Sequence, residues 1–148
     1  MKNYKLLNFP QLGDERGHLV VAEGNKDIPF EIKRIFYIYG SDKDVVRGQH
    51  ANKLSEFVLI NLCGNCDIFV DDGKNKETII LDKPHQGIYL NKLVWKNMFN
   101  FSKDSVLLVL SNEHYNCEEY IRDYEEFKKI TREKKINEKI ISYYTCLF

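Results

Sequence analysis

The sequence predicts an all-β, antiparallel fold for most of the chain, followed by a shorter helical segment. Short apolar or β-branched runs recur at a spacing of roughly 8–12 residues, which is typical of β-sandwiches and barrels. Gly, Asp, Asn and Pro stand between these runs, and these residues favour turns. Apolar residues at helical spacing begin only after Ser111. We therefore expect one domain over residues 1–148, with its barrel over about residues 4–112.

The predicted strands are separated by clear turn signals. Asp72-Gly73 is a strong hairpin signal, because glycine accepts the positive φ that such a turn requires. Gly64-Asn65 indicates a second turn between two strands. The expected strand runs are, in chain order, 19–22, 32–39, 57–62, 66–70, 78–81, 87–90 and 106–110.

A C-terminal helical segment is expected over about residues 116–145. Between Glu118 and Phe127, apolar and aromatic side chains recur at helical spacing with charged residues between them. The predicted packing stripe consists of Tyr120, Ile121, Tyr124 and Phe127. Such a stripe favours packing against the barrel over ligand binding.

Composition excludes several classes of function. The chain of 148 residues has 22 basic and 22 acidic residues and a formal net charge of zero, which argues against nucleic acid or an anionic membrane surface as the main partner. No apolar run approaches the ~18 residues of a membrane span. The N-terminal residues lack the apolar stretch and cleavage site of a signal peptide. We expect a cytoplasmic protein.

The cysteines do not indicate a metal or redox centre. Cys63 and Cys66 have CxxC spacing, but they flank the expected turn at Gly64-Asn65. A structural zinc site would need two further ligands at similar spacing, and Cys117 and Cys146 each stand alone. We expect two thiols beside a hairpin turn.

The segment Arg47 to Lys53 carries the strongest functional signal. It reads Arg-Gly-Gln-His-Ala-Asn-Lys, and it places His50 and Asn52 two residues apart at the start of a strand. Residues i and i+2 of a strand point to the same face, so both side chains project into whatever the sheet encloses. Histidine suits proton transfer near neutral pH, and Arg47 could hold a phosphate or a sugar oxygen.

This segment resembles the Arg-Gly-x-His-Ala-His-Lys signature of the bacterial sugar 3,4-ketoisomerases, a branch of the cupin superfamily. Four further segments are similar to signatures of that family, and together they cover about residues 14 to 128 in order and spacing. These segments are 29–39, 86–90, 94–99 and 119–127.

The resemblance implies a cupin jelly-roll barrel that forms a homodimer and uses no metal or other cofactor. It implies a dTDP-linked 4-keto-6-deoxyhexose as substrate. A proton would leave C3, a proton would be added at C4, and the 3-keto isomer would result. The resemblance also implies that the product feeds an aminotransferase, which makes 3-amino sugars for lipopolysaccharide or other surface glycans.

The chain departs from the family signature at Asn52, where the family has a second histidine. An amide cannot take or give a proton at physiological pH. Either His50 alone moves the proton while Asn52 steadies the enediolate oxygen, or the chain binds a nucleotide sugar without isomerising it. Tyr37 and Tyr39 share a strand face and could supply the missing acid. An epimerase or a metal-dependent cupin with the same pocket is a further alternative.

The resemblance also implies a set of substrate-binding residues. Arg34 is expected at the pyrophosphate. Arg16 and Lys96 stand where the family influences which face of the sugar receives the C4 proton, and Arg16 favours the galacto product. His18, after the Arg16 turn, and Trp95, before Lys96, are expected near the same pocket.

Overall fold

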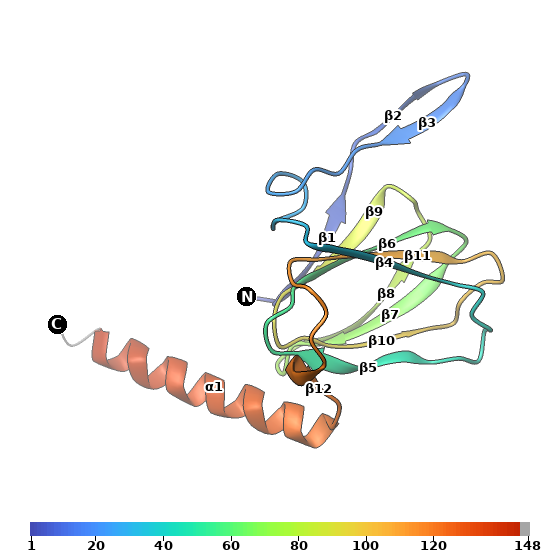
Figure 1. Cartoon of the computed structure of the whole chain (residues 1–148). Coiled ribbons are helices and arrows are strands. Elements are labelled where there is room, and N and C mark those ends of the chain that lie inside the picture. Colours follow the sequence, from blue (N-terminus) through green and yellow to red (C-terminus); the bar gives the residue numbers. More distant parts are fainter. Residues whose placement is uncertain (146–148) are drawn as a thin grey trace.

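Two five-stranded antiparallel sheets form the body of the protein, as Figure 1 shows. The computed structural model describes residues 1–145. The first sheet has the strand order β1-β9-β6-β11-β4 and the second has the order β12-β5-β10-β7-β8, while β2 and β3 pair separately. The predicted all-β, antiparallel class with a C-terminal helix is confirmed.

Six strands of the two sheets, β4, β6, β7, β8, β9 and β11, correspond to predicted runs, whereas β1, β10 and β12 match none of them. Those of the first sheet are β1 (Tyr4–Asn8), β4 (Arg34–Tyr39), β6 (Phe57–Cys63), β9 (Gln86–Leu90) and β11 (Val106–Ser111). Those of the second sheet are β5 (Arg47–Asn52), β7 (Cys66–Asp71), β8 (Lys76–Leu81), β10 (Trp95–Phe99) and β12 (Tyr120–Ile121).

The main core lies between the facing sheets. Alternate residues of each strand point inward, and the apolar ones lose essentially all contact with water. Fully buried members include Leu59, Ile68, Val70, Ile88 and Leu107. The apolar core therefore fills the space between the two sheets.

The turn signals in the sequence correspond to turns in the structure. Gly73 adopts φ of 78° between β7 and β8, and Gly64 adopts φ of 63° between β6 and β7. Cys63 is exposed and Cys66 is buried on either side of the second turn, and both are free thiols. Cys146 lies outside the described residues.

A hairpin of β2 (Gln11–Asp14) and β3 (Gly17–Val20) extends away from the barrel (Figure 1). Its two largest apolar side chains remain in solvent, with Leu12 54% and Leu19 58% exposed. The hairpin therefore has no core of its own within the described chain.

The predicted helix over residues 116–145 begins later than expected. Cys117–Glu119 forms a short 3₁₀ turn, Tyr120–Ile121 forms β12, and α1 spans Tyr124–Thr145. The four stripe residues do not lie on one helix, because Tyr120 and Ile121 pair with the edge of β5, although Ile121, Tyr124 and Phe127 do pack in one cluster with Trp95. The Asp123 carboxylate then accepts a hydrogen bond from the Glu126 amide at 2.7 Å, which starts the helix.

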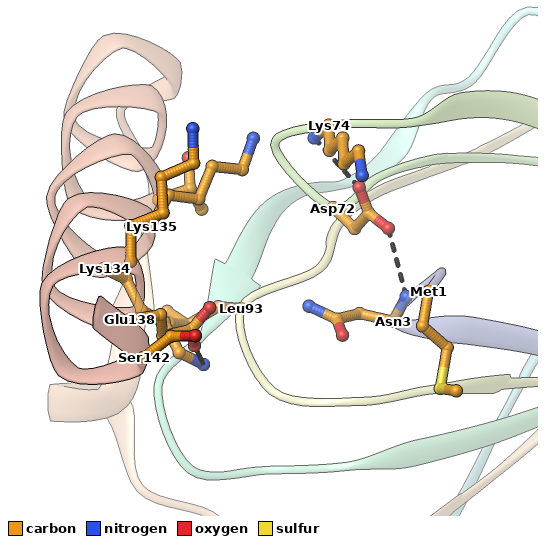
Figure 2. A pocket seen from close by; sticks show the side chains of 11 residues that line it. Met1, Asn3, Asp72, Lys74, Leu93, Lys134, Lys135, Glu138 and Ser142 are labelled. Atoms are coloured by element: carbon orange, nitrogen blue, oxygen red, sulfur yellow. Dashed lines mark hydrogen bonds and ion pairs between the residues drawn. The ribbon is translucent and has the colours of Figure 1, made fainter. Parts of the chain in front are cut away.

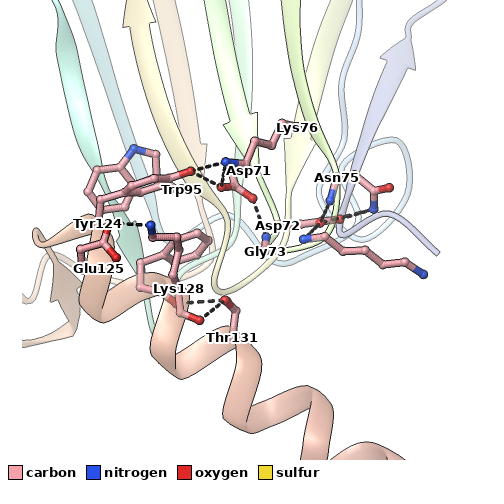
Figure 3. A network of polar contacts seen from close by, with 12 residues as sticks. Asp71, Asp72, Gly73, Asn75, Lys76, Trp95, Tyr124, Glu125, Lys128 and Thr131 are labelled. Carbon is pink, nitrogen blue, oxygen red and sulfur yellow. Dashed lines mark hydrogen bonds and ion pairs between the residues drawn. The ribbon is translucent and has the colours of Figure 1, made fainter.

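The first turns of α1 pack on the outer face of the second sheet. The ring of Trp95 lies 5.0 Å from that of Tyr124 and 5.7 Å from that of Phe127, centroid to centroid. Figure 3 shows the polar contacts beside these rings. The Tyr124 hydroxyl donates to Asp71 at 2.5 Å and accepts from Lys76 at 2.9 Å. Together these contacts fix the start of α1 against β7, β8 and β10.

Further along, α1 leans over the β7–β8 turn. A side chain at Gly73 would lie 2.6 Å from Thr131, so glycine permits this close approach. Beyond that contact, a cavity of about 580 Å³ lies between α1 and the barrel. Figure 2 shows residues that line it, among them Asn3, Asp72 and Lys135. Within the described residues, no helix is long and apolar enough to span a membrane.

Candidate active site

A bulge in β5 positions His50. His50 is paired with Lys96 across β5 and β10, and the register shifts between Lys96 and Asn97. Gly48 and Gln49 both have positive φ, at 83° and 53°. A Cβ at Gly48 would lie 2.7 Å from the carbonyl oxygen of Lys96, so only glycine fits there. Because such a bulge re-aims side chains, it sets the direction of His50.

The His50 imidazole is held as a neutral base. Its Nδ1 lies 2.8 Å from the carbonyl oxygen of Gly48. A carbonyl only accepts hydrogen bonds, so Nδ1 carries the hydrogen and Nε2 keeps its lone pair. Burial and the positive charge of Lys96 lower the pKa of His50 to about 4. His50 is therefore uncharged and able to accept a proton at neutral pH.

A buried polar chain runs beside His50. The Lys96 ammonium donates to Asn52 Oδ1 at 2.7 Å, and Asn52 Nδ2 donates to Glu119 Oε1 at 3.1 Å. Glu119 also accepts from the amides of Leu54 and Ser55 and from the Ser55 hydroxyl. Burial raises the pKa of Glu119, but these hydrogen bonds outweigh it and hold the pKa below its usual value. Glu119 is therefore a fixed anion.

Lys96 is the buried cation of this chain of contacts. Its side chain is 5% exposed, and its Nζ lies 4.6 Å from the centroid of the Phe57 ring. The pKa of Lys96 is lowered to about 7, because the effect of burial outweighs the opposing charge of Glu119 and is assisted by the charge of Arg34. The amine is therefore poised between its protonated and neutral forms near neutral pH.

Arg34 places a second cation in the same part of the barrel. Its guanidinium lies 5.3 Å from the ring of Phe36, 6.0 Å from Phe57 and 5.8 Å from Tyr115. One terminal nitrogen donates to the Ser111 hydroxyl at 3.4 Å. The Nε atom is buried and has no hydrogen-bond partner among residues 1–145. Because buried donors are nearly always paired, this nitrogen is a candidate contact for an anionic ligand.

β12 adds residues that the sequence did not single out for the site. Tyr120 lies over His50 with ring centroids 4.6 Å apart, and the Arg122 guanidinium lies 4.7 Å from the Tyr120 ring. Glu119 belongs to the same segment. The only sequence signal for them was the family-like segment at 119–127, and the pairing of β12 with β5 brings them to His50.

Comparison with known proteins assigns the family. The family model described as "FdtA: WxcM-like, C-terminal" matches residues 2–132. The curated TDP-4-oxo-6-deoxy-alpha-D-glucose-3,4-oxoisomerase of Aneurinibacillus thermoaerophilus is 45% identical over 125 residues, which are 84% of this chain and 90% of that protein. The chain belongs to the FdtA family. The resemblance found in the sequence is thereby confirmed.

Solved structures of sugar ketoisomerases share the fold. A 3,4-ketoisomerase from Helicobacter canadensis is 48% identical with a TM-score of 0.85, and the match covers 89% of this chain and 99% of that one. The sugar 3,4-ketoisomerase QdtA from Thermoanaerobacterium thermosaccharolyticum, solved with TDP, is 40% identical with a TM-score of 0.86, covering 89% and 96%. The predicted cupin architecture is confirmed. The match to the FdtA family model ends at residue 132, within α1.

Among the residues predicted for the site, the barrel brings four together. His50, Asn52 and Lys96 share the inner face of the second sheet. Arg34 lies on the facing sheet and touches the same Phe57 ring as Lys96. These four side chains form the candidate FdtA-family site of this chain.

Three predicted residues point out of the barrel instead. Tyr37 and Tyr39 are 63% and 69% exposed, because alternate residues of β4 face opposite sides and Arg34 takes the inner side. Trp95 precedes Lys96 in β10 and therefore faces α1. None of the three contacts His50 within the described chain.

Three further predicted residues lie at the exposed periphery. Arg16 and His18 belong to the β2–β3 hairpin, and Arg16 pairs with Asp14 at 2.5 Å. Arg47, at the exposed start of β5, donates to the Ser41 hydroxyl at 3.1 Å. The fold of one chain does not bring these residues to His50.

Proposed function

We propose that this protein isomerises a TDP-linked 4-keto-6-deoxyhexose to its 3-keto isomer. One observation carries the proposal: His50 is a neutral imidazole with a free Nε2, next to the buried cation Lys96. Removal of a proton beside a carbonyl needs a base of this kind. It also needs positive charge for the enediolate oxygen that develops.

The proton transfer on carbon is assigned to His50. The imidazole takes the C3 proton, and the electron pair moves through the new C3=C4 bond to the carbonyl oxygen. The same imidazole, after its Nε2 proton exchanges with solvent, then delivers a proton to C4 on the same face of the sugar. Asn52 orients Lys96 but cannot transfer a proton itself. That no metal or cofactor takes part stays a prediction.

The substrate class follows from the relatives. QdtA has been solved with TDP, and a histidine-to-asparagine variant of it has been solved with TDP-4-keto-6-deoxyglucose. We assign the diphosphate of such a substrate to the unpaired Nε of Arg34. A 3-keto product is the substrate that an aminotransferase needs to make a 3-amino sugar. Its use in lipopolysaccharide and a cytoplasmic location both stay predictions.

A homodimer is part of the proposal. The outer side of edge strand β4 exposes Ile35, Tyr37 and Tyr39, and the projecting hairpin exposes Leu12 and Leu19. Such exposed apolar residues favour burial against a second copy. The hairpin could then carry Arg16 and His18 to the other copy's barrel. Sedimentation velocity on the wild type and on Tyr37→Glu tests this: a dimer that the variant breaks is expected, and a monomeric wild type contradicts it.

The catalytic proposal is tested by incubating the protein with TDP-4-keto-6-deoxyglucose and following the sugar by NMR. We expect resonances of the 3-keto isomer to appear. The same spectra give the configuration at C4 of the product. Binding of TDP by calorimetry without any isomer would instead support a non-catalytic binding protein. A product with an inverted centre but an unmoved carbonyl would support an epimerase.

A further inference from the structure

The cavity between α1 and the barrel lies apart from the candidate active site. Its volume of about 580 Å³ is within the range of roughly 300–1000 Å³ in which proteins bind small molecules. One wall is the second half of α1, and the opposite wall includes the β7–β8 turn and the residues before β1, as Figure 2 shows. Among the described residues that line it, none belongs to the group of His50, Asn52, Lys96 and Arg34. The isomerisation therefore makes no use of this cavity.

Two contacts hold α1 against the β7–β8 turn and give the cavity a fixed wall. Thr131 is 6% exposed and lies against Gly73, where a larger residue would not fit. One helical turn further, the Lys135 ammonium donates a hydrogen bond to the Gly73 carbonyl oxygen at 2.5 Å. The FdtA family model ends at residue 132, so the lining residues from Lys134 onward lie beyond the family match. Most of the helical wall thus comes from a part of α1 that the family match does not include.

The lining of the cavity is more basic than the chain as a whole. It contains four lysines and two acidic residues, whereas the whole sequence has equal numbers of basic and acidic residues. Four lysines and two carboxylates leave an excess of two positive charges around this small volume, and such an excess attracts anions. The lysines are Lys74 in the β7–β8 turn and Lys134, Lys135 and Lys139 on α1, and the acidic residues are Asp72 and Glu138.

The carboxylate of Asp72 is already bound by the backbone around it. It accepts hydrogen bonds from the backbone amides of Asn3, Lys74 and Asn75, and from the Asn75 side chain. Burial raises the pKa of Asp72, but these hydrogen bonds outweigh it and hold the pKa below its usual value. Asp72 is therefore a fixed anion, and among the described residues it forms no ion pair with a lysine.

Three of the four lysines remain available to an anion. Glu138 lies 4.0 Å from Lys134, and both side chains are more than half exposed, so this ion pair contributes little in water. Within residues 1–145, neither Lys74 nor Lys139 has an acidic side chain within ion-pair distance. Lys74 lines the barrel wall, whereas Lys134 and Lys139 line the helical wall. An anion between the two walls therefore faces positive charge on both sides.

We propose that this cavity binds the diphosphate group of a small phosphorylated molecule. A lysine ammonium is a compact charge that binds phosphate oxygens, and a diphosphate carries enough negative charge to meet the cations of both walls. Leu93 also lines the cavity and offers apolar surface to the remainder of such a molecule. The site is additional to the substrate site. Binding at this cavity does not depend on the proposed isomerisation, so a wild type without isomerase activity leaves the proposal unaffected.

Amide chemical shifts of the isotopically labelled full-length protein show where pyrophosphate binds. In a titration at low ionic strength, where charges are least screened, we expect the amides of Gly73 and Thr131 to shift with an apparent Kd below about 1 mM. Lys74→Gln combined with Lys139→Gln should weaken this binding about tenfold or more, because one cation is lost from each wall. Pyrophosphate that leaves both amides unshifted, or that binds this double variant as tightly as the wild type, overturns the proposal.

Two further variants test whether the charge inside the cavity matters. Lys103→Gln combined with Lys129→Gln removes two exposed lysines outside the cavity, and pyrophosphate affinity at Gly73 should change by less than about twofold. A loss as large as that of the cavity double variant would show nonspecific attraction and overturn the proposal. Glu138→Gln removes a carboxylate from the lining and should tighten binding about threefold. If the cavity double variant does not fold, Glu138→Gln decides, and unchanged or weaker binding overturns the proposal.

TDP and inorganic phosphate are titrated in the same way to separate the sources of the phosphate groups. Tighter binding of TDP than of pyrophosphate at the Gly73 and Thr131 amides supports the proposal with a nucleotide as the ligand. Equal or weaker binding of TDP supports it with the diphosphate alone. Inorganic phosphate that binds as tightly as pyrophosphate overturns the assignment to a diphosphate. Binding of TDP in the active site is distinguished by shifts at His50, which lies outside the cavity lining.

Discussion

Trp95 and Lys96, neighbours on opposite faces of strand β10, are about equally buried, but they serve different purposes. Lys96, on the inner face, is 5% exposed and lies in a chain of polar contacts with Asn52 and Glu119. Trp95, on the outer face, is 6% exposed and packs on the aromatic rings of Tyr124 and Phe127. Two adjacent residues thus belong to different environments, a buried charge network on one face and a buried aromatic cluster on the other.

The difference shows what each face contributes. Burying apolar area stabilises a fold. Burying two opposite charges that are joined by an amide side chain, as Lys96 and Glu119 are, contributes little to stability or lowers it. The outer face therefore accounts for attachment of α1. The inner face retains Lys96 and His50 at a cost in stability, which is expected of groups kept for their chemistry. Substitutions on the two faces should separate activity from stability.

The largest effect is expected from His50→Gln on the inner face. Loss of the base should lower the rate of isomer formation by about 1000-fold or more, because a general base contributes roughly 10²- to 10⁴-fold. Its melting temperature should stay close to that of the wild type. NMR product assays and thermal melts check both. Activity within tenfold of the wild type would remove His50 from the mechanism.

On the outer face, Trp95→Ala should mainly affect stability. Truncation of a buried indole costs about 3–5 kcal/mol, and the start of α1 should loosen from the barrel. Denaturant unfolding measures the loss, with Trp95→Phe as the matched variant that keeps a ring against Tyr124. Under conditions where Trp95→Ala is folded, its turnover should stay within about threefold. A variant that is stable but inactive would contradict the separation of the two faces.

Asn52→Leu should affect both properties, because it removes the amide that joins Lys96 to Glu119. Two buried charged groups then lose a hydrogen bond each, for which we expect a loss of about 2–4 kcal/mol in unfolding free energy. Isomer formation should fall as well. Leu93→Met, on the outer side among the residues that pack with Trp95, serves as control. Stability unchanged in Asn52→Leu would show that the amide is dispensable.

The smallest effect is expected in the pH dependence of kcat/KM, which reports groups of the free enzyme. His50 must be neutral, so kcat/KM should rise with pH through about 4, where the imidazole loses its proton. Lys96 must be protonated to stabilise the enediolate oxygen, so kcat/KM should fall above about 7. In Lys96→Arg, which keeps its charge, the alkaline limb should disappear. An unchanged limb in that variant would assign it to another group.

The sequence predicted the strands well but only part of the site. The short apolar or β-branched runs and the turn residues located six strands of the two sheets, since β propensity and positive φ are local properties. His50 and Asn52 were predicted because they lie two residues apart on one strand. Glu119 and Tyr120 were not, because they reach His50 only through the pairing of β12 with β5, which no local pattern encodes. The helical spacing at 118–127 gave a wrong start for α1 for the same reason.

The alternation of side chains along a strand explains why several predicted site residues lie outside the site. The sequence alone shows that Tyr37 and Tyr39 lie on the opposite face of β4 from Arg34. Which of the two faces points into the barrel depends on the opposing sheet. Trp95 and Lys96 are neighbours in the sequence and therefore cannot both face the barrel. Arg16 and His18 belong to a hairpin that projects away from the barrel, which the local sequence does not indicate.

The central claim is that the inner face of this barrel removes the C3 proton of a 4-keto sugar nucleotide. The direct measurement is the C3 hydrogen of TDP-4-keto-6-deoxyglucose in D2O, followed by NMR with the wild type, His50→Gln and Trp95→Phe in parallel. The wild type and Trp95→Phe should replace this hydrogen with deuterium while His50→Gln leaves it in place. Retention of the hydrogen with folded, TDP-binding wild-type protein, or its exchange by His50→Gln at the wild-type rate, would contradict the account.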